Sequence, residues 1–142
     1  MAVFPISHVA ISCKNPIEVE KFYTKHFGFK RARVYLPGPD QVVMIKSGNT
    51  YLELFKATKE LPVPKSEGSG QDYSGWKHIC FLVDDLEAKL SEMGEAAKLS
   101  LGPTDMSAFI PNMKVCWIED PEGNIVELNQ GYVDEENPPE LI

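Results

Sequence analysis

Two histidines and two glutamates occupy matching places in the two halves of the 142-residue chain, and their side chains are well suited to binding a metal ion. His8 opens the apolar run SHVAIS, and His78 opens the run KHICFLV. Later in each half a second run carries one glutamate at an otherwise apolar position, Glu53 in TYLELF and Glu127 in NIVELNQ. A carboxylate among apolar residues is costly to bury unless it is paired or bound to a metal. Two imidazoles and two carboxylates together could supply such a metal site.

Alternation along these runs predicts which way the four side chains point. Successive side chains of a strand face opposite sides of a sheet, so His8 shares a face with Ala10, and His78 shares a face with Cys80. The larger aliphatic residues on the alternate face are suited to packing under a helix. We therefore expect the histidines and glutamates on the concave side of the sheet, unless a one-residue bulge reverses a strand.

The elements of the first half that must position these residues are a strand, a helix and three further strands. Residues 6–12 are rich in β-forming residues. Asn15 and Pro16 are typical of a helix start, because asparagine caps a helix and proline suits its first position, and Gly28 ends the predicted helix. The β-type segments that follow are separated by the turn signals PGPD and SGN. They lie at about 30–36, 40–46 and 50–56.

The second half repeats this plan after a linker at 57–75 that is rich in proline, serine and glycine. A loop of this length is either a mobile cover of an active site or a simple connection. Asp84-Asp85 caps a second helix, which Gly94 ends. Strands follow near 97–101, in MKVCWIED and in NIVELNQ, and the turn PEGN joins the last two as a hairpin.

An internal duplication of a β-α-β-β-β unit summarises these elements, and the predicted fold class is α+β. The helices cover one face of each sheet, so we expect the other faces to meet or to curve around a shared cavity. The expected organisation is a single domain, 1–142. Its parts are module one at about 4–56, the linker at 57–75, module two at about 76–130 and an acidic tail at 131–142.

Composition limits the classes of partner. The formal charge of −7 argues against nucleic acid, which needs a basic surface, but leaves a small anionic substrate open. No apolar run approaches the roughly 20 residues of a membrane helix, and the start MAVFPISH lacks the features of a secretory signal. The three cysteines, Cys13, Cys80 and Cys116, are odd in number and have no CxxC spacing. We therefore expect a cytoplasmic protein with free thiols.

Four motifs in this order resemble the vicinal oxygen chelate superfamily, which includes glyoxalase I, methylmalonyl-CoA epimerase, fosfomycin-resistance proteins and extradiol dioxygenases. They are SHVAIS, EKFYTKHFGF, KHICFLVDDLEAKLSEMG and EDPEGNIVELNQ, and the resemblance covers about residues 4–130. It implies two tandem β-α-β-β-β modules whose curled mixed β-sheet surrounds a metal-binding cavity. It also implies that two copies of the chain form a homodimer. His8, Glu53, His78 and Glu127 match the four ligand positions of the family. These donors suit one divalent ion per site, Ni, Co, Zn, Fe or Mn.

The resemblance implies a metal-dependent isomerase or lyase of the glyoxalase I type that acts on a small 2-oxo or 2-hydroxy compound or its thiol adduct. Glu53 or Glu127 would transfer the proton through a metal-bound enediolate. Bacterial glyoxalases that use glutathione carry an arginine where this chain has Ser12 and an asparagine where it has Ala57. The groups that anchor glutathione are thus missing, which puts lactoylglutathione lyase activity in doubt.

Two other functions fit the same resemblance. An epimerase of the methylmalonyl-CoA type uses similar ligands, although it often has glutamine at the place of Glu53. A binding protein of the bleomycin-resistance kind would sequester a small molecule without catalysis. Several other residues have two interpretations: His26 is expected to be solvated or to cap the helix, and Lys114 to meet an anionic substrate or solvent. The residues that either line a pocket or belong to the core are Trp76, Phe109, Met113 and Trp117.

Overall fold

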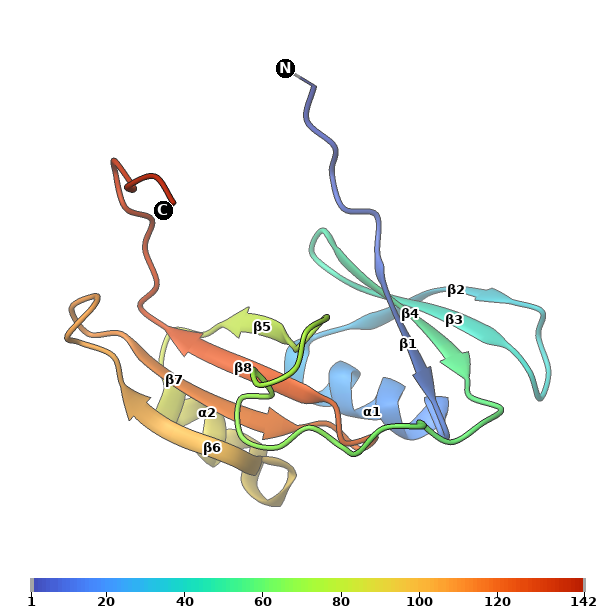
Figure 1. Ribbon diagram of the computed structural model, residues 1–142. Helices are drawn as coiled ribbons and strands as arrows, with labels where there is room; N and C mark the ends of the chain where they lie inside the picture. Colours follow the sequence, from blue (N-terminus) through green and yellow to red (C-terminus); the bar gives the residue numbers. More distant parts are fainter. Residues whose placement is uncertain (1, 142) are drawn as a thin grey trace. The chain divides into compact units, whose positions relative to one another are not determined.

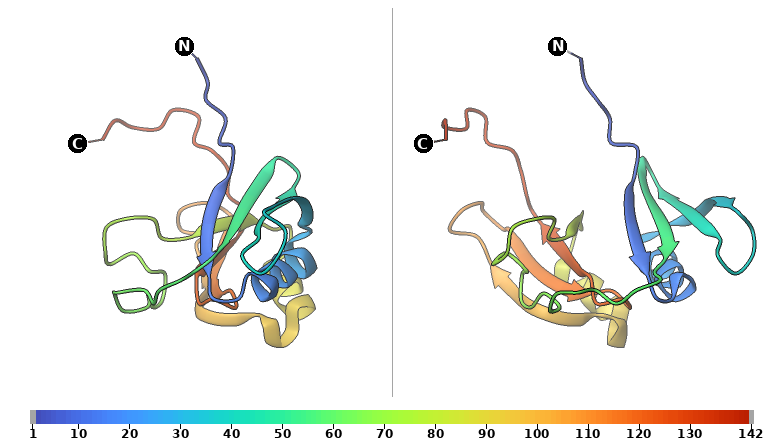
Figure 2. Two further views of the ribbon diagram at one scale, coloured as in Figure 1. Left: turned by 90° about the vertical axis from the view of Figure 1, so that its right-hand side faces the viewer. Right: turned by 45° about the vertical axis from the view of Figure 1, so that its right-hand side comes forward.

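The computed structural model describes residues 2–141 and contains two units built on the same plan (Figures 1 and 2). The first unit comprises the residues up to Pro64 together with Asp120–Gly123. The second comprises Lys65–Glu119 and the residues from Asn124 onward. Each unit has a four-stranded mixed sheet, so the predicted α+β fold with two β-α-β-β-β modules is confirmed.

The sheet of the first unit has the strand order β1-β4-β3-β2. β1 runs parallel to β4, whereas β3 pairs antiparallel with both β4 and β2. The parallel pairing is possible because helix α1 and two strands separate β1 from β4 along the chain. The elements are β1 (Val9–Cys13), α1 (Pro16–Phe27), β2 (Lys30–Tyr35), β3 (Val42–Ser47) and β4 (Thr50–Lys56).

Helix α1 begins and ends at the residues that the sequence predicts. The side chain of Asn15 accepts a hydrogen bond of 3.3 Å from the backbone N–H of Glu18, and Pro16 occupies the first helical position. Gly28 follows the helix with a φ of +70°, a left-handed conformation that glycine adopts without strain. The N-terminal end of α1 therefore follows closely on β1, and its C-terminal end closely precedes β2.

The core of the first unit lies between α1 and the sheet face that carries alternate residues of β3 and β4. Tyr23 is fully buried there, and its hydroxyl donates a hydrogen bond of 2.9 Å to the buried carboxylate of Asp120. His26 is also buried, at 7% exposure, and its ring lies 5.3 Å from that of Phe22. The expectation that His26 is solvated was therefore wrong. The remaining core residues include Val19, Val43, Ile45, Leu52 and Leu54.

The second unit repeats this arrangement with the strand order β5-β8-β7-β6. Again the first strand, β5, is parallel to the last, β8, and the other pairs are antiparallel. Asp85 caps α2 by accepting a hydrogen bond of 2.9 Å from the backbone N–H of Ala88. The elements are β5 (Ile79–Leu82), α2 (Leu86–Met93), η1 (Gly94–Ala96), β6 (Lys98–Asp105), β7 (Lys114–Glu119) and β8 (Ile125–Gln130).

The segments β6 and 57–75 differ in how regular their backbone is. β6 has eight residues and two register shifts against β7, so it extends beyond the weak strand predicted near 97–101. Residues 57–75, all of which the structure describes, contain no helix or strand. Within residues 2–141, none of the helices has the length and apolar character required to cross a membrane.

Candidate metal centre

The first predicted pair of ligands is brought together by the parallel pairing of β1 and β4. Ala10 is the register partner of Glu53, and His8 lies two residues earlier, directly before β1. The Nε2 atom of His8 is 3.5 Å from Oε1 of Glu53. The neighbouring Leu52 and Leu54 are fully buried on the opposite face, under α1. Alternation along β4 therefore directs Glu53 to the sheet face that the helix leaves uncovered.

The second pair has the same construction in the second unit. Cys80 is the register partner of Glu127 in the parallel pair β5 and β8, and His78 lies two residues before Cys80. The Nε2 atom of His78 is 4.0 Å from Oε1 of Glu127. The side chains of Glu53 and Glu127 are 17% and 16% exposed, so both carboxylates are mostly shielded from water.

Each pair has a spacing close to that of two ligands of one ion. Two donors that each lie about 2.1 Å from a metal are about 3.0–3.5 Å apart. The observed separation of 3.5 Å in the first pair lies within this range, and that of 4.0 Å in the second pair is slightly longer. Within the described residues, no cluster of three or more His, Cys, Asp or Glu side chains suitable for a metal ion is present. Each unit thus contributes two donors on its own uncovered sheet face.

Two residues beside Glu127 were not predicted to adjoin the metal ligands. Trp117 is its cross-strand partner on β7, and Cys80 is its partner on β5. Although Cys80 is an exposed residue, desolvation of its thiol raises the pKa of Cys80 well above the usual range, and the hydrogen bond to Glu127 and its charge raise it further. The thiol is therefore protonated at neutral pH. Both neighbours follow from the strand register, which could not be predicted from the sequence.

The other residues singled out in the sequence lie elsewhere. Trp76 is fully exposed, and the ammonium group of Lys114 is 3.3 Å from the carboxylate of Glu87, so Lys114 has a partner within the protein.

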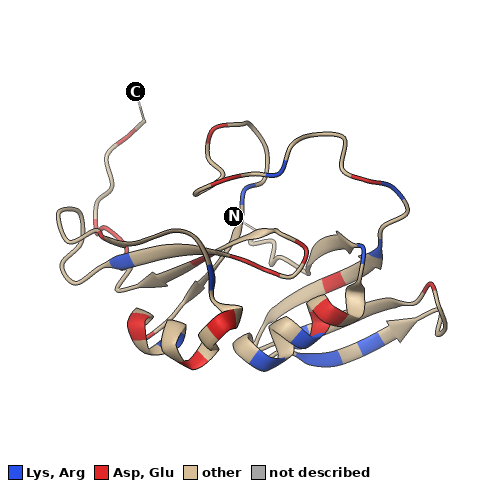
Figure 3. Cartoon of the chain, turned by 90° about the horizontal axis from the view of Figure 1, so that it is seen from below, with Lys and Arg blue, Asp and Glu red and all other residues tan. Residues whose placement is uncertain are grey.

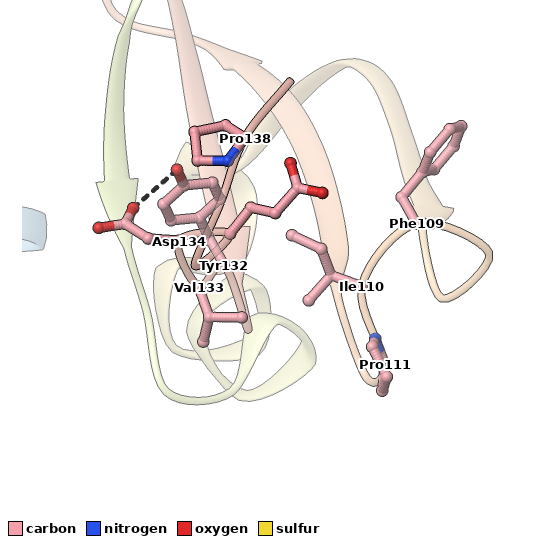
Figure 4. Close-up of a pocket in the computed structure, with 8 residues that line it drawn as sticks. Phe109, Ile110, Pro111, Tyr132, Val133, Asp134 and Pro138 are labelled. Atoms are coloured by element: carbon pink, nitrogen blue, oxygen red, sulfur yellow. Dashed lines mark hydrogen bonds between the residues drawn. The ribbon is translucent and has the colours of Figure 1, made fainter. Parts of the chain in front are cut away.

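Phe109 lines a pocket of about 690 Å³ in the second unit, where Tyr132 donates a hydrogen bond of 2.9 Å to Asp134 (Figure 4). None of the four predicted metal ligands lines that pocket. Its lining residues are Phe109, Ile110, Pro111, Tyr132, Val133, Asp134, Glu135 and Pro138.

Comparison with protein families agrees with this architecture and with the motifs. The profile of the Glyoxalase/Bleomycin resistance protein/Dioxygenase superfamily matches residues 5–128, and the chain belongs to this superfamily. The vicinal oxygen chelate resemblance is thereby confirmed. No curated protein sequence matches the chain significantly.

Solved structures with the same fold include proteins of different activities. An antibiotic-binding protein, TnmS3 from a Streptomyces species, has a TM-score of 0.61 at 20% identity, over 93% of this chain and 99% of that one. A lactoylglutathione lyase from Agrobacterium tumefaciens has a TM-score of 0.52 at 24% identity, over 89% and 93%. A fosfomycin resistance protein from Listeria monocytogenes, solved with Mn(II), has a TM-score of 0.67 at 9% identity, over 93% and 94%. At these identities the likeness shows a shared fold.

Proposed function

We propose that this protein is a metal-dependent isomerase or lyase of the glyoxalase I type, which transfers a proton at a carbon next to a carbonyl group. The observation that supports this proposal is the repeated pair of one histidine and one glutamate at the same register position of both units. The spacing within each pair, 3.5 Å and 4.0 Å, suits two ligands of one ion. A duplicated pair on two uncovered sheet faces has no role in either hydrophobic core.

In this proposal His8, Glu53, His78 and Glu127 together bind one divalent ion. Two neutral imidazoles and two carboxylates balance the charge of such an ion, and Ni, Co, Zn, Fe and Mn all accept this donor set. When bound, the ion supplies Lewis-acid polarisation of the substrate carbonyl.

The residues of the chain supply the proton transfer. A carboxylate of Glu53 or Glu127 accepts the proton from the acidic carbon and returns it to the neighbouring carbon, so no external acid or oxidant is consumed. The low exposure of both carboxylates limits competition from water. Because Ser12 and Ala57 replace the groups that anchor glutathione, we propose a 2-oxo or 2-hydroxy substrate that is not a glutathione adduct.

Exchange of substrate hydrogen with solvent deuterium tests this activity. Metal-loaded protein is expected to introduce one deuterium into a 2-hydroxy carbonyl compound, measured by mass spectrometry, and Glu53→Gln or Glu127→Gln is expected to slow the exchange at least about 100-fold. A hemithioacetal of glutathione and methylmalonyl-CoA serve as parallel substrates. Exchange confined to methylmalonyl-CoA would favour the epimerase function. Absence of exchange in a broad panel of carbon acids would contradict the proposal.

A second candidate function is reversible binding of a small molecule without catalysis. The structural likeness to the antibiotic-binding protein TnmS3, at a TM-score of 0.61, favours this candidate. Tight binding of an antibiotic to metal-free protein, together with no deuterium exchange, would support it over the enzyme.

We also propose that the protein forms a homodimer. The segment before β1 carries three large apolar side chains that are more than four-fifths exposed, Val3, Phe4 and Ile6. Contiguous exposed apolar residues of this kind are typical of surfaces that contact another chain.

A further inference from the structure

A pocket of about 310 Å³ lies in the first unit, next to the pair formed by His8 and Glu53. Its walls come from β2, β3 and β4 and from the segment before β1. Two of its lining residues connect it to the pair, because Ser7 directly precedes His8 and Met44 is the cross-strand partner of Glu53. The lining residues are Ser7, Ala32, Arg33, Tyr35, Met44 and Tyr51.

A β-bulge in β2 directs Arg33 into this pocket. The register shifts between Arg31 and Arg33, so that Arg31 lies opposite Ile45 and Arg33 lies opposite Met44. Ile45 is fully buried on the helix side, and Arg31 accordingly donates a hydrogen bond of 2.7 Å from Nε to Glu20 of α1. Without the bulge, both arginines would share one face. With it, Arg33 points to the uncovered face, on which Met44 lies between it and Glu53.

Arg33 and Lys46 on this face have no acidic partner among the residues that the structure describes. Arg33 lies over the ring of Tyr35, 5.8 Å from its centroid, and Lys46 lies over the ring of Tyr51, 5.3 Å from its centroid. Many other basic residues of this acidic chain form ion pairs, for example Lys14 with Glu60. The strand β2, which carries Lys30, Arg31 and Arg33, forms one edge of this sheet (Figure 3).

The register adds a like-charge contact to this group. Lys30 is the cross-strand partner of Lys46, and like charges placed directly opposite each other are destabilising. A bound anion would relieve this repulsion. Because the whole chain carries a charge of −7, its long-range field does not attract anions, and anion binding requires a local cationic group of this kind.

We propose that Arg33 binds the oxyanion of a small molecule whose apolar body packs against Tyr35, Met44 and Tyr51. Lys46 lies outside the pocket lining, over the ring of Tyr51, and adds a second positive charge at its margin. This proposal deepens the proposed function, since it makes the substrate an anion whose reacting carbonyl reaches the ion held beside Glu53. Arg33 presents a planar fork of N–H donors that matches a carboxylate or phosphate, and the tyrosine rings hold both cations in place. Arg33 and Lys46 are therefore proposed to determine substrate specificity.

Titration of metal-free protein with three aromatic probes, followed by NMR chemical shifts, tests the anion site apart from the metal. Phenyl phosphate and benzoate are expected to bind and to shift the amide signals of β2 and β3, whereas neutral benzyl alcohol is expected to bind at least about tenfold more weakly. Comparison of the two anions distinguishes a phosphate ligand from a carboxylate ligand. Arg33→Gln and Lys46→Gln are each expected to weaken binding of the preferred anion by roughly tenfold.

Lys25→Gln is the matched control, because Lys25 is an exposed cation of the same unit that lies on α1, on the other side of the sheet. It removes the same charge, and less than about a twofold change is expected, as for a solvent-screened surface charge. Equal effects of Lys25→Gln and Arg33→Gln, or equal binding of benzyl alcohol and the anions, would overturn the proposal. Anion binding by metal-free protein that fails to bind a metal would preserve this site and reject the proposed metal function.

Discussion

Replacing Glu53 with alanine is expected to lower the affinity of the protein for a divalent ion by at least about 100-fold, and replacing Glu127 is expected to do the same. Loss of groups that merely orient metal ligands typically lowers metal affinity 10–100-fold, and removal of a ligand itself has a larger effect. The two effects should be similar because both glutamates occupy the same register position, one in each unit. Competition with a chromophoric chelator for Zn²⁺ or Ni²⁺ measures the affinity.

Glu92→Ala provides the control for these variants. Glu92 is a carboxylate of α2 whose side chain is 67% exposed, so its removal changes the net charge by the same amount and leaves all four predicted ligands in place. Its metal affinity is expected to stay within about twofold of the wild type, because exposed charges are screened by solvent. If Glu53→Ala and Glu127→Ala retained wild-type affinity, neither carboxylate would be a ligand. A loss in only one of them would restrict binding to one unit.

Replacing Leu54 with alanine is expected to lower the free energy of unfolding by about 2–5 kcal/mol, the usual cost of truncating a fully buried leucine. Leu54 has no exposed surface and lies in β4 directly after Glu53, with its side chain on the helix side of the sheet. Its loss removes apolar burial and leaves a cavity under α1. Urea denaturation followed by circular dichroism measures the change.

Phe55→Ala tests whether this cost depends on the face of the strand. Phe55 is the next residue and is 37% exposed on the uncovered face, so its truncation is expected to cost less than Leu54→Ala. Equal destabilisation by the two substitutions would contradict the alternation that places Glu53 opposite the core. Leu128, fully buried directly after Glu127, is the equivalent of Leu54 in the second unit.

Local signals were sufficient to predict most of the elements. The caps Asn15 and Asp85 and the glycines at 28 and 94 mark helix ends through hydrogen bonds within a few residues, so the sequence alone predicts them. Side-chain alternation likewise predicts the face on which Glu53 lies. Contacts between residues far apart in the sequence were harder to predict. The burial of His26 depends on packing against the sheet, and helical position alone did not indicate it.

Strand register explains what the sequence did not show at the candidate site. Cys80 and Trp117 neighbour Glu127 because β5 and β7 both pair with β8 in a particular register. The amino-acid composition does not predict that register. The bulge in β2 is a stronger case, because strict alternation places Arg31 and Arg33 on one face whereas the observed register separates them. Arg33 was accordingly absent from the residues predicted to meet a substrate.

Anomalous scattering at the absorption edge of the metal, from crystals of protein loaded with Zn²⁺ or Ni²⁺, shows whether the four side chains bind one ion. We expect one peak for each set of His8, Glu53, His78 and Glu127, with a donor atom of each residue about 2.0–2.2 Å from it. Two separate peaks, one at each histidine–glutamate pair, or the absence of any peak near these side chains would contradict this expectation.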